Sequence, residues 1–320
     1  PRAEVAWVGG ETAALRRVQD YLFDTDALGL DYVGATLTTD PSKSVMRNGT
    51  MSKLSPWLAH GCLSPRRLYA EVKRYERERP RRKGKSTYYI VHELIWRDFS
   101  RFQALAMGKS IFKLAGHRNV RPPWRWSKDS SLFRAWRDGM TGIPFVDAYM
   151  RELAGTGYCG HMGRETVGWF LARDLGLDWR MGAEWFESAL IDYEPAANWF
   201  NWMYRCLPAV AKSGEPRAHL RTIETLVWGA QHDPDAEFTK RWLPELSGLP
   251  AAVAREPWRL VMLPEDRGVD PRSFKALRYG TDYPRPVIPP VVVEGVEKVA
   301  DQARQAQAAR ARKIRQARAQ

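Results

Sequence analysis

Residues 174–204 read DLGLDWRMGAEWFESALIDYEPAANWFNWMY. Apolar residues recur at three- and four-residue spacing on both sides of a short acidic segment, which predicts two helices joined by a break. Trp179 and Trp202 lie in the two helical patterns, whereas Asp192 and Glu194 lie in the break. This density of oxidisable indoles beside fixed polar groups indicates an organic redox cofactor rather than a hydrolytic centre.

The same helical spacing recurs along most of the chain and predicts an all-α fold. The breaks between helices carry Gly, Pro or Asp, as in residues 141–144. The sequence shows no convincing alternating strand and no GxGxxG motif after a strand, so a Rossmann dinucleotide site is not supported. The expected helices are residues 11–23, 64–79, 87–107, 131–138, 144–155, 163–174, 181–190, 196–204 and 236–245.

Composition excludes several classes of protein. With 320 residues, of which 44% are hydrophobic, and a mean hydropathy of -0.48, the chain predicts a soluble globular protein with a large core. No apolar run approaches the roughly 20 residues that span a membrane. The 3 cysteines are too scattered for a disulfide framework or a CxxC metal site, so we expect no metal and a reducing, intracellular compartment. The organelle stays open.

The net charge of +13 is concentrated in two segments of the chain. Residues 66–85 carry ten Lys or Arg against three Glu, and residues 294–320 carry seven basic against three acidic residues. Such runs attract a phosphate backbone without reading sequence. A solvated surface helix and a mobile tail are the alternative interpretation.

A domain boundary is expected near residues 286–293, PVIPPVVV. We therefore expect a helical domain over residues 1–290 and a basic tail over residues 291–320. The tail is rich in Ala, Arg and Gln and predicts a helix that stands away from the domain.

Two short motifs each have a functional and a plain structural interpretation. In ELIWR, Glu93, Trp96 and Arg97 lie at i, i+3 and i+4 and so share one helical face. They form either an ion pair beside a packed ring or a floor that hydrogen-bonds and stacks a base. In residues 50–57, TMSKLSPW, hydroxyl side chains around Lys53 precede a helix, which suits either a phosphate or a simple helix cap.

Eight segments, in order along the chain, resemble the FAD-binding domain of the cryptochrome/photolyase family. They are GGETAALRRVQDYL, SKLSPWLAHGCLSPR, HELIWRDFSRF, LFRAWRDGMTGIPFVDAYMRELAGTGY, FLARDLGLDWRMGAEWFESALIDYE, NWFNWMY, HDPDAEFTKRWLPEL and YPRP. The resemblance covers about residues 9–288 and is greatest to DASH cryptochromes, whose Asn-x-x-Asn-Trp-x-Tyr pattern is present from Asn198 to Tyr204. It implies a helical domain that binds FAD. The N-terminal α/β antenna domain of the family is absent from this chain, so no antenna folate is expected on it.

The resemblance also implies roles for individual residues. An electron path is implied along Trp126, Trp179 and Trp202, with Trp202 nearest the flavin and Trp126 at the surface. Contacts to FAD are implied for Tyr32, Thr50, Met51, Ser52, Lys53, Leu54, Ser55, Arg164, Asp192, Glu194 and Asn198. Among these residues, Arg164 and Asp192 match a buried ion pair of the family beside the flavin ring. Contacts to a flipped pyrimidine dimer and its surroundings are implied for Glu93, Trp96, Arg97, His161 and Tyr204.

The implied activity is light-driven repair of cyclobutane pyrimidine dimers by a monomer acting on single-stranded or looped DNA, where extracting the dimer costs least. The alternative is a blue-light receptor that photoreduces FAD and binds DNA or RNA without repair. His161 and Met162 replace Asn and Arg of the DASH pattern, and Glu165 replaces Gln, which favours the receptor. A basic binding module without a cofactor is the third hypothesis, and the intact tryptophan series argues against it.

Overall fold

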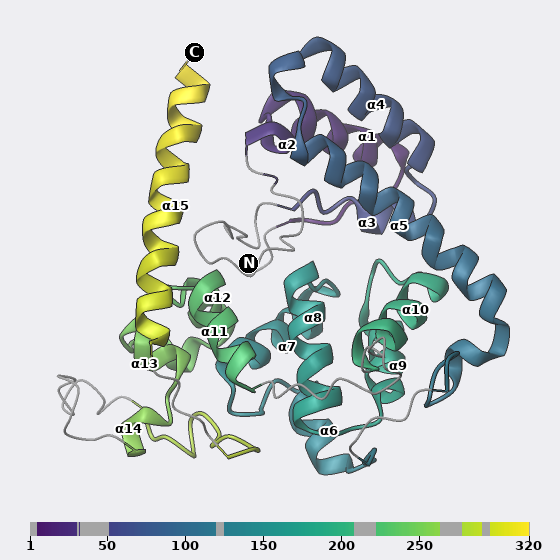
Figure 1. The fold of residues 1–320 in the computed structure, drawn as a ribbon. Helices are drawn as coiled ribbons and strands as arrows, with labels where there is room; N and C mark the ends of the chain where they lie inside the picture. The colour runs from purple at the N-terminus through teal and green to yellow at the C-terminus, as the bar shows by residue number, and fades with distance from the viewer. Residues whose placement is uncertain are drawn as a thin grey trace, which may run out of the picture.

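The computed structural model describes residues 5–30, 32, 51–119, 125–207, 222–262, 277–289 and 295–319. Across these ranges the chain is helical and forms no sheet (Figure 1). Two isolated β-bridges pair Ser127 with Leu177 and Tyr279 with Tyr283. The prediction of an all-α fold is therefore confirmed.

The helices fall into three consecutive groups along the chain. The first group is α1 (Glu11–Gln19), α2 (Ala27–Leu30), α3 (Ser55–Ala59), α4 (Pro65–Glu78) and α5 (Lys85–Met107). The second is α6 (Ser130–Arg137), α7 (Pro144–Thr156), α8 (His161–Trp169), α9 (Trp179–Ala189) and α10 (Pro195–Cys206). The third is α11 (Thr222–His232), α12 (Glu237–Trp242), α13 (Ala251–Arg255), α14 (Arg259–Met262) and α15 (Val296–Ala319).

Each of the nine predicted helices corresponds to a helix of the structure with small differences at its ends. Two of them end in a π-helical turn, Asp20–Asp24 after α1 and Phe170–Asp174 after α8. The predicted helix over residues 236–245 is α12 followed by a 3₁₀ turn, Pro244–Leu246. The spacing did not predict α2, α11, α13 or α14.

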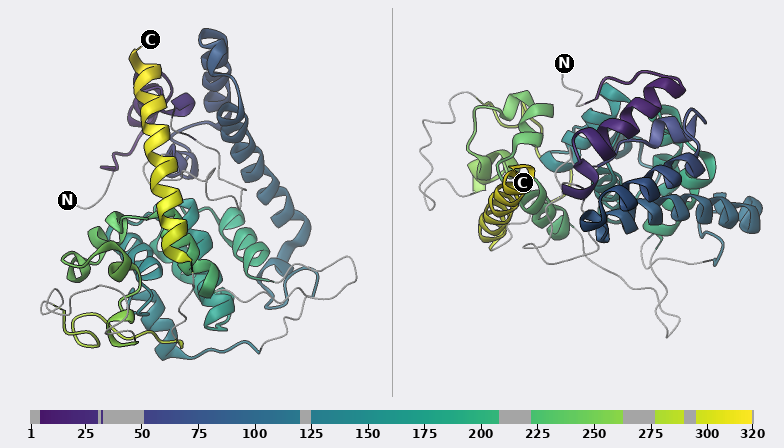
Figure 2. Two further views of the ribbon diagram at one scale, coloured as in Figure 1. Left: turned by 60° about the vertical axis from the view of Figure 1, so that its left-hand side comes forward. Right: turned by 90° about the horizontal axis from the view of Figure 1, so that it is seen from above.

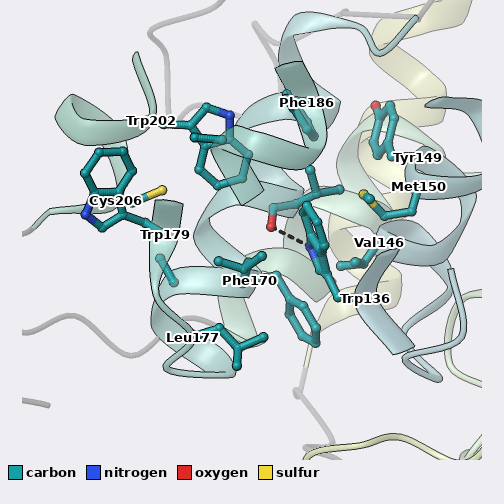
Figure 3. Packing of buried hydrophobic residues seen from close by; sticks show 14 of the residues in the cluster. Trp136, Val146, Tyr149, Met150, Phe170, Leu177, Trp179, Phe186, Trp202 and Cys206 are labelled. Atoms are coloured by element: carbon teal, nitrogen blue, oxygen red, sulfur yellow. Dashed lines mark hydrogen bonds between the residues drawn. The ribbon is translucent and has the colours of Figure 1, made fainter. Parts of the chain in front are cut away.

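Two hydrophobic cores position the candidate site. The first core lies among α1 to α5 and includes Leu22, Leu68 and Tyr75. The second lies among α6 to α10 and includes the fully buried Trp136 and Trp179 (Figure 3). Met51 packs against both cores, so the predicted phosphate-binding stretch lies where they meet. The long helix α5 joins them, because its second half packs against α10.

A buried carboxylate organises the turn before α7. Asp147 accepts hydrogen bonds from the backbone N–H groups of Thr141 (2.8 Å) and Gly142 (3.0 Å), from the Thr141 hydroxyl (2.6 Å) and from the Tyr283 hydroxyl (2.6 Å). Gly142 has φ +78°, and a Cβ there would lie 2.5 Å from the backbone of Arg285. The turn and the YPRP segment, far apart in sequence, are therefore fixed together.

We expect Asp147→Asn to destabilise the fold. Burial raises the pKa of Asp147 to about 6, while its hydrogen-bond donors oppose that rise, so the carboxylate is mostly ionised at pH 7. An amide would turn its NH₂ group toward donors and leave some of them unsatisfied, which costs about 1–3 kcal/mol. Urea unfolding measures this loss. Tyr283→Phe, which removes a single donor, is the milder control, and an unchanged midpoint for Asp147→Asn would contradict the role of this carboxylate.

The C-terminal helix α15 packs on the domain over its first half. Val296, Ala300 and Ala303 are buried, and α15 lies along α11. Glu297 pairs with Arg255 at 2.7 Å, and Arg304 pairs with Asp235 at 2.7 Å. The expectation of a helix that stands away is therefore wrong for this half, whereas the remainder rises beyond α12 (Figures 1 and 2). A boundary at residue 290 stays a prediction.

No helix in the described part of the chain is long and apolar enough to cross a bilayer.

Candidate functional site

An ion pair between α8 and the loop after α9 forms the centre of the site. One terminal nitrogen of Arg164 donates to both carboxylate oxygens of Asp192, at 2.8 and 2.7 Å, and Arg164 Nε donates to the Cys159 carbonyl at 2.7 Å. The Asp192 side chain is 2% exposed and that of Arg164 is 32% exposed. Burial lowers the pKa of Arg164, but the charge of Asp192 outweighs burial and raises it above its usual value. The sequence-based pairing of Arg164 with Asp192 is thus present as a fixed charge pair.

Tyr158 joins this ion pair to the predicted phosphate-binding stretch. The Arg164 guanidinium lies 5.7 Å and the Lys53 ammonium 6.0 Å from the centre of its ring. Its hydroxyl is hydrogen-bonded to the side chain of Ser55, and burial raises the pKa of Tyr158. Sequence reasoning missed Tyr158 as a site residue. The sequence feature that could have pointed to Tyr158 is the preceding Gly157. Its left-handed conformation (φ +68°) ends α7 and turns the chain toward α8.

The predicted phosphate-binding stretch is held between the two cores. Leu54 is buried, and the Ser52 carbonyl accepts a hydrogen bond from Arg17 Nε at 3.2 Å. Lys53 is 7% exposed and has φ +53°, an unusual conformation for a residue with a side chain. The neighbouring Thr50 lies outside the described residues. Met51, Ser52, Lys53, Leu54 and Ser55 therefore lie beside the ion pair as one stretch.

Tyr32 lies in the first core, and the half-buried Glu93 of α5 is close enough for its charge to act on the Tyr32 hydroxyl. Tyr32 is 2% exposed, and its carbonyl accepts a hydrogen bond from the Ser86 hydroxyl. Burial, followed by the charge of Glu93, raises the pKa of Tyr32. Tyr32, a predicted cofactor contact just after α2, and Glu93, a predicted lesion contact on α5, are thus neighbours.

Asn198 and Glu194 are held by α9, α10 and α5. Asn198 Nδ2 donates to the Ala183 carbonyl at 3.0 Å, which fixes the amide between α9 and α10. One Glu194 oxygen caps α10 by accepting from the Ala197 N–H at 2.6 Å, and the other pairs with Arg101 Nε at 3.1 Å. Glu194 therefore caps a helix, and its contact with a cofactor stays a prediction. Its partner Arg101 was not predicted.

An aromatic cluster lies where α5 meets α10. The Trp96 ring is 5.3 Å from Phe99, 5.9 Å from Phe200 and 5.6 Å from Tyr204, measured between ring centres. Trp96 Nε1 donates to Asn201 Oδ1 at 3.1 Å, which fixes the indole. Tyr204 is 53% exposed. The structure therefore brings the predicted Trp96 and Tyr204 together and leaves one of these rings open to solvent.

Arg97 has a different environment from Trp96. It pairs with Asp98 at 3.3 Å, and its guanidinium lies 3.5 Å from the Leu58 carbonyl. Burial, followed by the charge of Arg101, lowers the pKa of Arg97. The guanidinium therefore links α5 to α3, and its contact with a lesion stays a prediction.

Two residues that depart from the DASH pattern, His161 and Glu165, form a small polar cluster with Arg205. Glu165 pairs with Arg205 at 2.6 Å, and His161 Nε2 lies 3.4 Å from the same carboxylate. The Arg205 guanidinium also lies 5.6 Å from the centre of the Tyr204 ring. Because Arg205 balances its charge, Glu165 repels an approaching phosphate less than an isolated carboxylate would. Sequence reasoning missed Arg205, since this contact joins α8 to α10.

The three tryptophans of the predicted electron path pack in or against the second core, and Figure 3 shows Trp179 and Trp202. Trp179 is fully buried, and its Nε1 donates to the Leu114 carbonyl at 3.0 Å. Trp202 is 6% exposed and fits against Gly182, where a Cβ would lie 2.3 Å from its ring. Trp126 is partly buried at the edge of this core. Trp179 and Trp202 are thus buried and Trp126 is partly buried, and the electron path itself stays a prediction.

Trp185 and Trp199, the other two tryptophans of residues 174–204, have separate environments. Trp199 is buried, donates to Glu187 at 2.9 Å and lies 6.0 Å from Trp179. Trp185 lies beside an open cavity of about 280 Å³ between α6 and α9, lined also by Phe133, Met181, Glu184 and Ser188. None of the predicted cofactor residues lines that cavity.

The donors of the site fit an anionic dinucleotide better than a metal ion. Lys53 and Arg164 supply positive charge, and Ser52 and Ser55 carry hydroxyl groups, beside an indole-rich core. Within the ranges given above, no group of three His, Cys, Asp or Glu side chains is arranged to hold a metal ion. The residues present therefore fit a flavin dinucleotide.

The helical fold, together with the Arg164–Asp192 ion pair beside buried indoles, defines a flavin-binding domain. A family model described as the FAD-binding domain of DNA photolyase matches residues 89–301. Cryptochrome DASH of Gloeobacter violaceus is 42% identical over 292 residues, covering 90% of this chain and 53% of the relative. The chain belongs to the cryptochrome/photolyase family, and FAD is the cofactor of its domain.

Solved structures agree with this assignment. The cryptochrome of Synechocystis sp. PCC6803 matches with a TM-score of 0.74 and 39% identity, over 98% of this chain and 57% of that one. A class III photolyase of Agrobacterium tumefaciens matches with a TM-score of 0.66 and 27% identity, over 96% and 57%. This chain thus spans about half the length of the relatives it matches.

Proposed function

We propose that this chain is the flavin domain of a light-driven protein that repairs cyclobutane pyrimidine dimers in single-stranded DNA. The observation that carries the proposal is the Trp96 and Tyr204 pair, fixed by Asn201 and partly open to solvent. Aromatic rings placed in this way stack an extruded base without regard to its sequence. A relative named as a photolyase supports repair as the activity, and relatives named cryptochrome DASH support flavin photochemistry.

The cofactor supplies light absorption and one-electron chemistry when it is bound. The protein's part is to hold charges and rings in fixed places. Arg164 stays protonated against Asp192 and presents a fixed donor, while Lys53 and Ser55 offer a cation and a hydroxyl for a diphosphate. Asn198 uses its amide nitrogen in the bond to the Ala183 carbonyl, so we assign its carboxamide oxygen, an acceptor, to the cofactor.

We assign Trp126, Trp179 and Trp202 to carry electrons from the surface to the core. Trp126 is partly buried, so an external reductant can reach it, whereas Trp179 and Trp202 are shielded from water. Each indole can be oxidised and then restored by the next one outward. Glu93, Trp96, Arg97, His161 and Tyr204 are assigned to the dimer and its surroundings.

A blue-light receptor without repair is the second candidate function. The cluster of His161, Glu165 and Arg205 favours it, because the Glu165 carboxylate holds both basic side chains beside Tyr204. In that arrangement His161 and Arg205 are less able to bind a dimer. Such a receptor would keep the tryptophan series and lose the lesion pocket.

Illumination of the reduced protein with a dimer-containing oligothymidine separates the two functions. We expect the dimer to disappear under blue light from a single strand, and more slowly from the same strand in a duplex, because extrusion from a duplex costs unstacking energy. Chromatography of the digested oligonucleotide measures the dimer. Normal flavin photoreduction without loss of dimer would reject repair in favour of the receptor.

A further inference from the structure

The outer face of α5 carries a row of exposed apolar side chains. Tyr88, Ile95, Phe99, Phe102 and Leu105, named here the α5 ridge, are 63%, 61%, 40%, 69% and 79% exposed. The first four are separated by seven, four and three residues, so they lie along one face of the helix. Contiguous exposed apolar surface of this kind marks an interaction site.

The α5 ridge is continuous with the aromatic cluster described above. The Phe99 ring lies 5.3 Å from Trp96, and Trp96 lies 5.6 Å from Tyr204. Phe99 also meets Phe200 edge-on at 5.6 Å, so its ring is held on one side and exposed on the other. Phe102 lies one helical turn further on. The exposed rings thus lead away from Trp96 toward the end of α5.

Basic residues lie at both ends of the α5 ridge. Arg81, Lys83 and Lys85 are exposed where α5 begins, and Lys109 and Lys113 are exposed just after it ends. The α5 helix itself carries two acidic residues, and one of them, Asp98, is paired with Arg97 at 3.3 Å. Exposed rings with cations at either end suit a single-stranded polyanion, whose bases stack and whose phosphates pair.

We propose that the α5 ridge is a docking track for the single-stranded DNA that flanks the dimer. This proposal rests on the proposed function and adds a surface to it. Unpaired bases next to the lesion stack on Phe99 and Phe102, while Lys85 and Lys109 bind phosphates. A second copy of this chain is a poorer occupant, because the net charge of +13 and the basic ends repel a copy.

Binding of labelled oligothymidine, with and without one dimer, tests the track by fluorescence anisotropy. We expect Phe99→Ala and Phe102→Ala each to weaken the binding of both oligonucleotides by roughly five-fold or more, which is the effect of losing one stacked base. The preference for the damaged strand remains in Phe102→Ala, because Trp96 and Tyr204 are intact. Met140→Ala, an exposed apolar side chain on another part of the fold, is the matched control and leaves binding unchanged.

A salt titration distinguishes the contribution of charge to the binding affinity from that of base stacking. Lys85→Gln with Lys109→Gln is expected to lower the slope of log affinity against log salt by about 1.4, whereas Phe102→Ala leaves this slope as it is. Unchanged affinity of Phe102→Ala, with the damaged strand still bound, overturns the track and leaves the proposed function standing. A parent protein that binds neither oligonucleotide overturns both. Concentration-dependent dimerisation that Phe102→Ala abolishes assigns the ridge to self-association instead.

Discussion

Arg164→Met is expected to lose bound FAD and about 3–5 kcal/mol of the free energy of unfolding, as removal of one partner from a buried ion pair does. The Asp192 side chain is 2% exposed, so without Arg164 its charge stays buried with no counterion. The methionine keeps much of the side-chain length and removes the charge and the donors. The flavin-to-protein absorbance ratio and the urea midpoint measure the two losses.

Asp192→Asn is the matched control for this prediction. It leaves Arg164 as the uncompensated charge, but that side chain is 32% exposed and water can solvate part of it. We therefore expect a smaller loss of stability, about 1–3 kcal/mol, from the bonds that the amide fails to accept. Equal stability of Arg164→Met and the parent protein would contradict the central role of this pair.

Trp202→Phe is expected to lose most of the rate of flavin photoreduction while FAD stays bound. The indole is the innermost of the proposed path, and phenylalanine is too hard to oxidise to replace it. The substitution also removes packing against Gly182, which costs about 0.5–3 kcal/mol as core changes usually do. Absorbance under continuous blue light with an external reductant measures the rate.

Trp185→Phe is the control for the electron path. Trp185 lies beside the cavity between α6 and α9 and is outside the proposed series. We expect the flavin of the Trp185→Phe variant to be photoreduced at the same rate as that of the parent protein. Equal rates in Trp202→Phe and Trp185→Phe would rule out Trp202 as an obligatory carrier.

The helices of the domain could be predicted from sequence because their patterns are local. The pattern in residues 174–204 predicted the break that places Asp192 between α9 and α10, and the structure has this break. The buried face of α15 was also present in the sequence, as Val296, Ala300 and Ala303 at i, i+4 and i+7. It was missed because small residues surround it and its partner α11 was not predicted.

The partners of the site residues could not be predicted from local pattern. Arg205 on α10 pairs with Glu165 on α8, and Arg101 on α5 pairs with Glu194 just before α10. Tyr158 becomes central because the turn at Gly157 brings it under Arg164. Family resemblance supplied the pairing of Arg164 with Asp192, but the contacts that hold this pair depend on the packing of distant segments.

The absorption spectrum of the purified chain shows whether the residues around Arg164 and Asp192 bind FAD. If the residues around Arg164 and Asp192 form a flavin site, the protein carries FAD at close to one per chain, or takes it up when it is added. Blue light then bleaches this spectrum in the presence of an external reductant. A colourless preparation that binds no added FAD, although it is folded by circular dichroism, would contradict a flavin site at this ion pair.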